Sequence, residues 1–373
     1  MDIIPYLKLM AEKNASDLFF CTGVAVTMKI EGVMRAVGSE TLAVGVAHQV
    51  ANSVMTDEQI QEFEKTLEMN FAMPLKGVGR FRFNIFRQRG EVSLVVRYIN
   101  MHIPRIEEMN LPNILEDLIM IKRGLVLVVG ATGSGKSTSL AAMIGHRNRT
   151  QASHILTIED PLEFVHQHAR SIVQQREVGI DTHSYANALK NAMREAPDVI
   201  LIGEIRDLAT MRHAIAYAET GHLCLATLHS NNANQALDRI INFYPETARD
   251  QLLIDLSLNL RAIVSQRLVF GKDGLRLPAV EVMLNTPYIE ELIEKGDLTA
   301  IKGAMKESTD EGVVTFDQAL LALFQSGKIT LEEALANADS KNDLSLLVRM
   351  GENKNKSSST TSASTKEASE LLF

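Results

Sequence analysis

The 373-residue chain is 46% hydrophobic and carries a formal net charge of −8, which predicts two or three domains with a sizeable core. Its acidity argues against a protein whose main task is to grip nucleic acid, and its two cysteines, Cys21 and Cys224, exclude a disulfide framework or a four-thiolate zinc site. Because the N-terminus lacks a signal-peptide pattern and no apolar run is long enough to span a bilayer, we expect a cytoplasmic protein without direct membrane insertion.

Residues 1–100 mix helical and strand patterns, which predicts a small α+β domain. A helix is expected over 1–13, and two more are expected within 46–67, the second opening with a capping box at Thr56 and Gln59. Strands are expected over 18–21 and 25–30 with a turn at Glu31 and Gly32, and over 80–86 and 92–99 as a hairpin linked by residues 87–90. Residues 101–112 contain two prolines and predict a linker.

From 113 to 350 the patterns of strand and helix alternate, which is typical of a mainly parallel sheet wrapped by helices. The expected core strands are 124–129, 154–158, 199–202 and 223–227. One long amphipathic helix is expected over 245–270, because leucine, isoleucine and valine recur there at helical spacing. Residues 351–373 are rich in Ser, Thr and Lys and predict a disordered tail.

The eight residues from Gly130 to Ser137 fill the pattern G-x-x-x-x-G-K-[ST] of a phosphate-binding loop. An apolar strand precedes the loop and a helix follows it, so backbone amides and the helix N-terminus would face phosphate oxygens. A glycine-rich turn without a ligand is the plainer alternative. We predict ATP binding, with Lys136 on the β- and γ-phosphates and the Ser137 hydroxyl on Mg²⁺. The predicted nucleotide-binding residues are Gly130, Ala131, Thr132, Gly133, Ser134, Gly135, Lys136, Ser137 and Thr138.

Two apolar strands deliver carboxylates toward the edge of the predicted sheet. Glu204 follows the strand 199–202, and a carboxylate at the carboxyl end of a strand can act on Mg²⁺. Glu163 follows the strand 154–158, which Pro161 ends. It belongs to a group of three acids within five residues, whose mutual repulsion is tolerable only in solvent or near a cation. The plainer alternatives are a surface glutamate and an acidic surface turn. Both glutamates are candidate catalytic groups.

His222 and His229 stand at the two ends of the strand 223–227. Zinc binding is one alternative, helped by His166 and His168, but no third and fourth ligand follows with metal spacing. A neutral histidine that senses the γ-phosphate or bridges subunits is favoured, and two solvated histidines are the plainer alternative.

Together these segments resemble one family, the type IV pilus retraction ATPases of the PilT/PilU type, within the secretion ATPase superfamily. The resemblance covers nearly the whole chain apart from the tail. Its motifs lie at 15–18, 79–84, 130–138, 159–164 (the Asp box), 195–198, 204–207, 220–229 (the His box) and 260–268.

The resemblance implies a PAS-like N-terminal domain and a RecA-like ATPase domain, assembled as a hexameric ring with nucleotide between the two domains. It also implies an inner-membrane platform protein as partner, at the cytoplasmic face of the pilus base, with pilus disassembly and twitching motility as the outcome. The implied residue roles are phosphate binding by Lys136, polarisation of the attacking water by Glu163, action on Mg²⁺ by Glu204 (Walker B), a His-box pair of His222 and His229, and phosphate contacts from Arg82 and Arg97. Ordinary surface arginines are the alternative for Arg82 and Arg97.

One departure from the family concerns the helix after Thr286-Pro287. Family members of the PilT kind carry Ala-Ile-Arg-Asn-Leu-Ile-Arg-Glu there, whereas this chain has Glu290 and Glu294 at the two arginine positions and Lys295 at the last glutamate. The apolar positions remain at helical spacing, so the helix should still pack, but its outer charge is reversed. The departure resembles the accessory PilU branch, which implies cooperation with a PilT-type ATPase.

Four other interpretations stay open. The chain could retract pili independently in the PilT manner, or it could be a pilus-assembly or type II secretion ATPase, although such proteins usually add a longer N-terminal region and a four-cysteine zinc module. A RecA-like nucleic-acid motor would share the phosphate loop, but no basic, aromatic-interleaved stretch accompanies it here. An interaction protein that holds ATP without turnover is the alternative of a different class.

Overall fold

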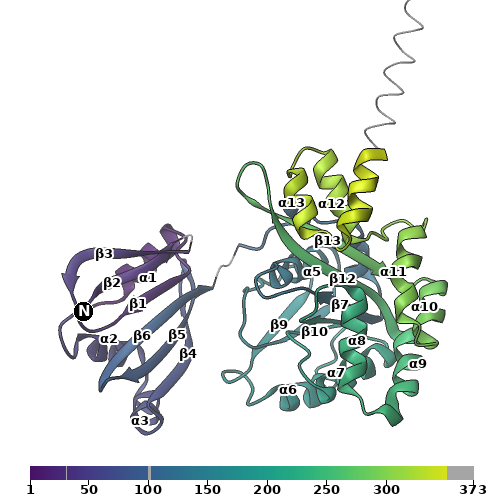
Figure 1. The fold of residues 1–373 in the computed structure, drawn as a ribbon. Helices are drawn as coiled ribbons and strands as arrows, with labels where there is room; N and C mark the ends of the chain where they lie inside the picture. The colour runs from purple at the N-terminus through teal and green to yellow at the C-terminus, as the bar shows by residue number, and fades with distance from the viewer. Residues whose placement is uncertain (31, 100–101, 351–373) are drawn as a thin grey trace, which may run out of the picture. The chain divides into compact units, whose positions relative to one another are not determined.

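A computed structural model of the chain describes residues 1–30, 32–99 and 102–350 (Figure 1). The predicted turn residue Glu31, the first linker residue Met101 and the predicted tail lie outside the described residues. The chain forms two compact units. The first contains Met1–Ile103 and Asn148–Pro197, and the second contains Pro104–Arg147 and Asp198–Phe373.

The N-terminal part of the first unit is a six-stranded sheet in the order β3-β2-β1-β6-β5-β4, in which neighbouring strands are antiparallel. The apolar side chains of the sheet and helices share one core. The prediction of a small α+β domain is confirmed, although β3 and β4 were not predicted. The elements are α1 (Ile4–Glu12), β1 (Asp17–Phe20), β2 (Ala25–Ile30), β3 (Val33–Thr41), α2 (Val46–Val54), α3 (Asp57–Thr66), β4 (Glu68–Leu75), β5 (Gly79–Gln88) and β6 (Glu91–Ile99).

The β5–β6 hairpin follows from strict alternation. Phe81, Phe83 and Ile85 are fully buried on one face of β5, while the residues between them are partly exposed. Arg89 and Gly90 both have positive φ, 51° and 82°, as a two-residue type I′ turn requires. The predicted hairpin is confirmed, as is the predicted capping box that begins α3.

The remainder of the first unit contains two parallel strands and a helix, β8 (His154–Glu159), β9 (Ile172–Glu177) and α6 (Tyr185–Ala192). The four side chains between the two end residues of β8 are buried. The strand therefore delivers the acidic segment that follows it to the surface. The strand β9 was not predicted, because its run Gln174-Gln175-Arg176 is polar.

The second unit contains strands in the order β13-β12-β7-β11-β10. β12, β7, β11 and β10 run parallel, and β13 pairs antiparallel with β12. Every residue of β7, β10 and β11 is buried, as in a sheet covered by helices on both faces. The elements are η1 (Glu107–Met109), α4 (Ile114–Met120), β7 (Gly124–Val129), α5 (Lys136–Thr150), β10 (Val199–Ile202), α7 (Leu208–Glu219), β11 (Leu223–Leu228), α8 (Ala233–Phe243), η2 (Glu246–Ala248), α9 (Arg249–Asn259), β12 (Leu260–Phe270), β13 (Arg276–Leu284), α10 (Pro287–Glu294), α11 (Leu298–Glu307), α12 (Phe316–Gln325) and α13 (Leu331–Asn337).

The predicted long helix over 245–270 is wrong in its second half. The helix α9 ends at Asn259, and residues 260–270 form strand β12 between β7 and β13. This strand is buried on both faces, so its apolar residues do not alternate strictly and match helical spacing as readily as strand spacing. Residues 260–270 form a strand because they pair with β7 and β13, and neither pairing can be inferred from the local sequence.

Glu281, on β13, is a buried carboxyl whose burial raises its pKa above the ordinary value of 4.5. Its Oε1 accepts hydrogen bonds from the Ala233 amide at 2.9 Å and the Ser265 hydroxyl at 3.0 Å. A carboxyl whose folded pKa is raised loses its favourable contribution as the pH rises from its unfolded value through its folded value.

We therefore expect Glu281→Gln to flatten the pH dependence of stability, because an amide oxygen accepts the same two hydrogen bonds without a charge. Urea unfolding of the wild type and the variant at about pH 5 and about pH 8 measures the effect. The free energy of unfolding of the variant relative to the wild type should rise between the two pH values. A constant difference would show that Glu281 titrates normally in the fold.

Candidate nucleotide-binding site

The phosphate-loop pattern joins the end of β7 to the start of α5, as predicted. Gly135 has φ +90°, and a Cβ atom added there would lie 2.7 Å from Nε2 of Gln266. At Gly130, with φ +155°, a Cβ atom would lie 2.4 Å from Oγ of Ser134. The loop therefore requires glycine both for its backbone conformation and for the close approach of β12.

Lys136 is buried at the first position of α5. Its Nζ donates hydrogen bonds to the carbonyls of Gly130 and Ala131, each at 2.9 Å, so the ammonium group folds back over the loop. Burial lowers the pKa of Lys136, and the charge of Glu204 partly offsets this effect. The next residue, Ser137, is exposed. This arrangement places an ammonium group and a hydroxyl side by side at a helix N-terminus, where an anion is stabilised.

Gln266 supports the loop from β12, and sequence reasoning gave it no role. Its Oε1 accepts a hydrogen bond of 2.7 Å from the Ser139 hydroxyl on the first turn of α5. The side chain of Gln266 is buried, as is that of its neighbour Ser265. Two adjacent polar residues inside an apolar strand were the available signal, because buried polar groups require specific partners.

Gly135→Ala is expected to raise the dissociation constant for ADP by about tenfold or more, because both the left-handed backbone and the contact with Gln266 oppose a methyl group. Gly303→Ala is the matched control, since this helical glycine has open space around its Cα and no positive φ. The control should bind ADP as the wild type does. Equal affinities of the two variants in a fluorescence titration would contradict this description of the loop.

Glu204 and His229 meet beyond the carboxyl ends of β10 and β11. Oε1 of Glu204 lies 3.2 Å from Nε2 of His229, and its Oε2 accepts a hydrogen bond of 2.7 Å from Nε of Arg206. The loop that carries Glu204 is fixed to the neighbouring strand, because the Ile205 amide donates to the carbonyl of Thr227 at 2.9 Å. Two residues that sequence reasoning selected separately thus form one contact.

His222 lies at the other end of β11. Its Nδ1 is 3.1 Å from the Thr220 hydroxyl oxygen, and its carbonyl accepts from the amide of Gly124 at the start of β7. Since β7 and β11 are parallel and the phosphate loop follows the end of β7, His222 stands at the opposite edge from the loop. A strand of this length separates His222 from His229 by about 20 Å. The two histidines therefore do not act on the same phosphate of one chain.

Glu163 belongs to the first unit and is exposed in the turn after β8, where the Asp160–Pro161 peptide bond is cis. Glu159 at the end of β8 is half-buried, and its burial raises its pKa. The Glu159 carboxyl accepts hydrogen bonds from the Thr157 hydroxyl at 2.7 Å and the Gln175 side-chain amide at 3.3 Å. A half-buried acid therefore precedes the exposed candidate base.

The two candidate arginines of the first unit both face carboxylates. Arg82 and Arg97 are register partners on β5 and β6. Nη1 of Arg82 lies 3.6 Å from Oε1 of the fully buried Glu177, and Nε of Arg97 lies 3.0 Å from Oδ1 of Asp17. Burial raises the pKa of Glu177, and the positive charge of Arg82 counteracts this effect. Any role toward phosphate would require these arginines to exchange partners.

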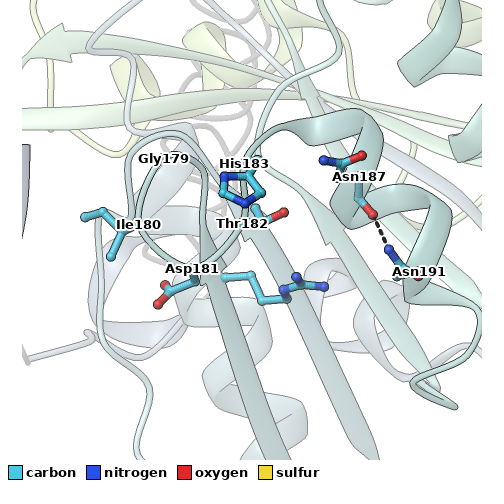
Figure 2. Close-up of a pocket in the computed structure, with 8 residues that line it drawn as sticks. Gly179, Ile180, Asp181, Thr182, His183, Asn187 and Asn191 are labelled. Atoms are coloured by element: carbon cyan, nitrogen blue, oxygen red, sulfur yellow. Dashed lines mark hydrogen bonds between the residues drawn. The ribbon is translucent and has the colours of Figure 1, made fainter.

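Two cavities in the described part of the chain are lined by loop residues. One, of about 300 Å³, adjoins the phosphate loop. The other, of about 400 Å³, is formed by the loop 179–183 facing α6 (Figure 2). On α6, Nδ2 of the Asn191 side chain donates a hydrogen bond to the carbonyl of Asn187. The first cavity extends from the phosphate loop to β12 and β13, and it is lined by Ala131, Thr132, Gly133, Ser134, Asn231, Gln266, Arg267, Leu268, Arg276 and Asn337.

Across residues 1–30, 32–99 and 102–350, no cluster of three or more His, Cys, Asp or Glu side chains has an arrangement that could hold a metal ion. Among the helices of these same residues, none combines the length and apolar character that a membrane span requires.

The comparisons with known proteins agree with one another. Residues 2–309 match the family model described as "Type II/IV secretion system protein". The type IV pilus ATPase PilU of Pseudomonas aeruginosa is 53% identical over 94% of this chain and 92% of its own length. The PilT retraction ATPase of the same organism is 39% identical over 91% of this chain and 98% of its own length.

Among solved structures, the crystal structure of the pilus retraction motor PilT with bound ADP has a TM-score of 0.86 and 38% identity, covering 92% of this chain and 98% of its own. This likeness confirms the predicted fold class, an N-terminal antiparallel-sheet domain with a mainly parallel, RecA-like domain. The chain belongs to the type II/IV secretion ATPase family and, within it, to the type IV pilus retraction ATPases of the PilT/PilU group.

Proposed function

We propose that this chain hydrolyses ATP as a motor subunit for type IV pilus retraction, in the manner of PilU. The observation that carries the proposal is the meeting of three elements at one edge of a parallel sheet. These are the phosphate loop with buried Lys136, the Glu204–His229 contact, and the adjoining cavity beside β12. An edge built in this way suits a nucleotide whose phosphates lie on the loop.

Each residue at this edge has a chemical task in the proposed reaction. Lys136 exchanges its loop carbonyls for phosphate oxygens, and the amides of the loop hold the remaining charge. The Ser137 hydroxyl and the Glu204 carboxylate are oxygen donors of the kind that Mg²⁺ prefers, and bound Mg²⁺ would neutralise phosphate charge. His229 holds Glu204 in orientation and can respond to the presence of the terminal phosphate.

Glu163 is the proposed group that polarises the attacking water, since it is the exposed acid of the turn after β8. Arg82 and Arg97 are proposed to contact phosphate after leaving Glu177 and Asp17. A guanidinium suits this task because it is always charged and planar.

The wider assembly follows from the family. We propose a homo-hexamer on the cytoplasmic side of the inner membrane, acting on a platform protein at the pilus base. Domain closure in successive subunits would convert each hydrolysis event into movement of that partner.

The accessory role is supported by α10. Ile289, Leu292 and Ile293 are buried against the fold, while Glu291 and Glu294 are exposed. The helix thus packs as predicted and presents acidic side chains outward. Such a surface should dock differently from one that carries arginines. We propose that the chain supports pilus retraction under load only together with a PilT-type ATPase.

The most informative experiment measures ATP turnover by the purified chain alone, then with a PilT-type partner, beside Lys136→Ala. Turnover in the wild type and its loss in the variant are expected. Stable folding without turnover under both conditions would instead favour a protein that holds ATP without hydrolysing it. Stimulation by single-stranded DNA would favour the nucleic-acid motor.

A second experiment tests the accessory role in cells. Twitching is measured in a strain where this chain is the only retraction motor, with the wild type and with Glu290→Arg/Glu294→Arg. The wild type should fail to support twitching, and the double variant tests whether α10 is the reason. Normal twitching with the wild type would overturn the accessory role.

A further inference from the structure

The cavity beside the phosphate loop contains a guanidinium group that the reaction described above does not use. Arg267 of β12 and Arg276 of β13 both line it, together with Ala131 and Gly133 of the loop. A cavity of about 300 Å³ has room for part of a nucleotide beyond the phosphates that the loop itself holds. Arg267 is three-quarters buried, whereas Arg276 is exposed. The buried arginine is therefore the more constrained of the two.

Contacts on three sides fix the guanidinium of Arg267. Nη1 donates to the carbonyl of Asn337 at 2.7 Å, and Nη2 donates to Oδ1 of Asp339 at 2.6 Å. Nη2 also donates to the carbonyl of Asn231 at 3.2 Å, and the guanidinium lies 3.9 Å from the ring centroid of Phe316. Because its planar face and one edge are held, the group has one preferred orientation toward the cavity.

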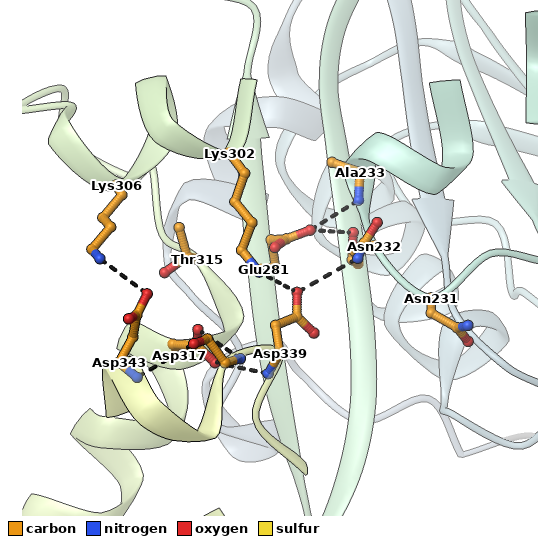
Figure 3. Close-up of polar contacts among 12 residues, drawn as sticks. Asn231, Asn232, Ala233, Glu281, Lys302, Lys306, Thr315, Asp317, Asp339 and Asp343 are labelled. Atoms are coloured by element: carbon orange, nitrogen blue, oxygen red, sulfur yellow. Dashed lines mark hydrogen bonds and ion pairs between the residues drawn. The ribbon is translucent and has the colours of Figure 1, made fainter. Parts of the chain in front are cut away.

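Asp339, just beyond α13, accepts one of these hydrogen bonds and also bonds to Lys302 and Asn232 (Figure 3). Its second oxygen, Oδ2, accepts from Nζ of Lys302 on α11 at 3.0 Å and from Nδ2 of Asn232 at 3.5 Å. Its own amide donates to Oδ1 of Asp317 on α12 at 2.9 Å. Burial raises the pKa of Asp339, but its hydrogen bonds and the charges of Lys302 and Arg267 outweigh burial and lower it. The group therefore stays a carboxylate.

The same carboxylate reaches the segment that follows His229. Asn232 is the N-cap of α8, and its side chain accepts from the Gln235 amide at 2.9 Å. The backbone amide of Ala233, the residue after Asn232, donates a hydrogen bond to Oε1 of Glu281 (Figure 3). Only two residues separate Asn232 from His229, whose ring contacts Glu204. A displacement of His229 from Glu204 would therefore shift Asn232, the N-cap of α8, and with it the hydrogen bond from Asn232 to Asp339.

We propose that Arg267 contacts the bound nucleotide and that Asp339 is the positioning residue that couples nucleotide occupancy to helices α11, α12 and α13. The proposal rests on nucleotide binding at the phosphate loop, as set out above. When nucleotide enters the cavity, Arg267 gains a ligand while it keeps its bond to Asp339. The C-terminal helices are thereby held more firmly against β12 and the cap of α8.

The test uses the full chain, a fluorescent ADP analogue with Mg²⁺, and the variants Asp339→Asn and Arg267→Lys. Each variant should raise the dissociation constant by about tenfold, as the loss of one charge-assisted contact predicts. Asp343→Asn is the matched control, because this exposed aspartate pairs with Lys306 and has no contact with Arg267. The control should bind ADP as the wild type does.

Amide hydrogen exchange distinguishes coupling from a merely structural role. In the wild type, ADP should slow exchange in residues 298–337, and Asp339→Asn should abolish this effect. Unchanged affinity and unchanged ADP-dependent protection in Asp339→Asn would overturn the proposal, even if its unfolding midpoint falls. If this variant does not fold, Arg267→Lys carries the same comparison. Failure of the proposed function is recognised separately, because the wild type itself would then bind no ADP.

Discussion

Lys136→Ala is expected to lower the rate of ATP hydrolysis by about a hundredfold or more, the scale set by removing a preorganised charge from a reacting site. In the structure its ammonium group is buried and held by the carbonyls of Gly130 and Ala131. Those two carbonyls are poor alternatives to phosphate oxygens, so nucleotide should attract the group away from them. Phosphate release at saturating ATP and Mg²⁺ measures the rate.

The control for this prediction is Lys295→Ala. Lys295 is exposed on α10's C-terminal side, and its ammonium group bonds only to Glu291 among the hydrogen bonds described for it. The Lys295→Ala variant therefore loses the same positive charge as Lys136→Ala but leaves the phosphate loop unchanged. If the two variants hydrolyse ATP at similar rates, the assignment of Lys136 is wrong, whatever the family suggests.

Glu204→Gln is expected to separate binding from turnover. The amide has the shape of the carboxylate, so the loop after β10 should keep its conformation, but the negative charge that we propose acts on Mg²⁺ is lost. We expect affinity for ADP within a few-fold of the wild type and hydrolysis slower by about 10²- to 10³-fold. Fluorescence titration and phosphate release, measured on the same preparation, provide the two values.

The matched control is Glu294→Gln, an exposed glutamate on α10. It should leave both quantities unchanged when the chain is assayed alone. Undiminished hydrolysis in Glu204→Gln would remove Glu204 from the reaction. If ADP binding is lost together with turnover, the Glu204–His229 contact instead maintains the structure of the binding site and does not act in the hydrolysis step.

The parts of the site that could be predicted from the sequence are those set by neighbouring residues. The loop between β7 and α5 is encoded in consecutive positions, and so are the strands that end just before Glu204 and His229. Because parallel strands share an orientation, the meeting of those two side chains also follows from the pattern. The alternation of β5 and β6 is equally local.

The remainder depends on contacts between distant residues. Gln266 and Arg267 lie in β12, a strand mistaken for a helix because both of its faces are buried. Asp339 reaches Arg267 across 72 positions, and no periodicity records such a contact. The position of His222 just before β11 is local, but its distance from the phosphate loop follows from the parallel pairing of β7 and β11.

The central claim is that the edge after β7 and β10 binds and splits a nucleoside triphosphate. Calorimetric titration of ATP with Mg²⁺ into the folded, purified chain tests it most directly. We expect saturable heat, absent in Lys136→Ala and retained in Lys295→Ala. A well-folded wild-type chain that gives no heat of binding would contradict it.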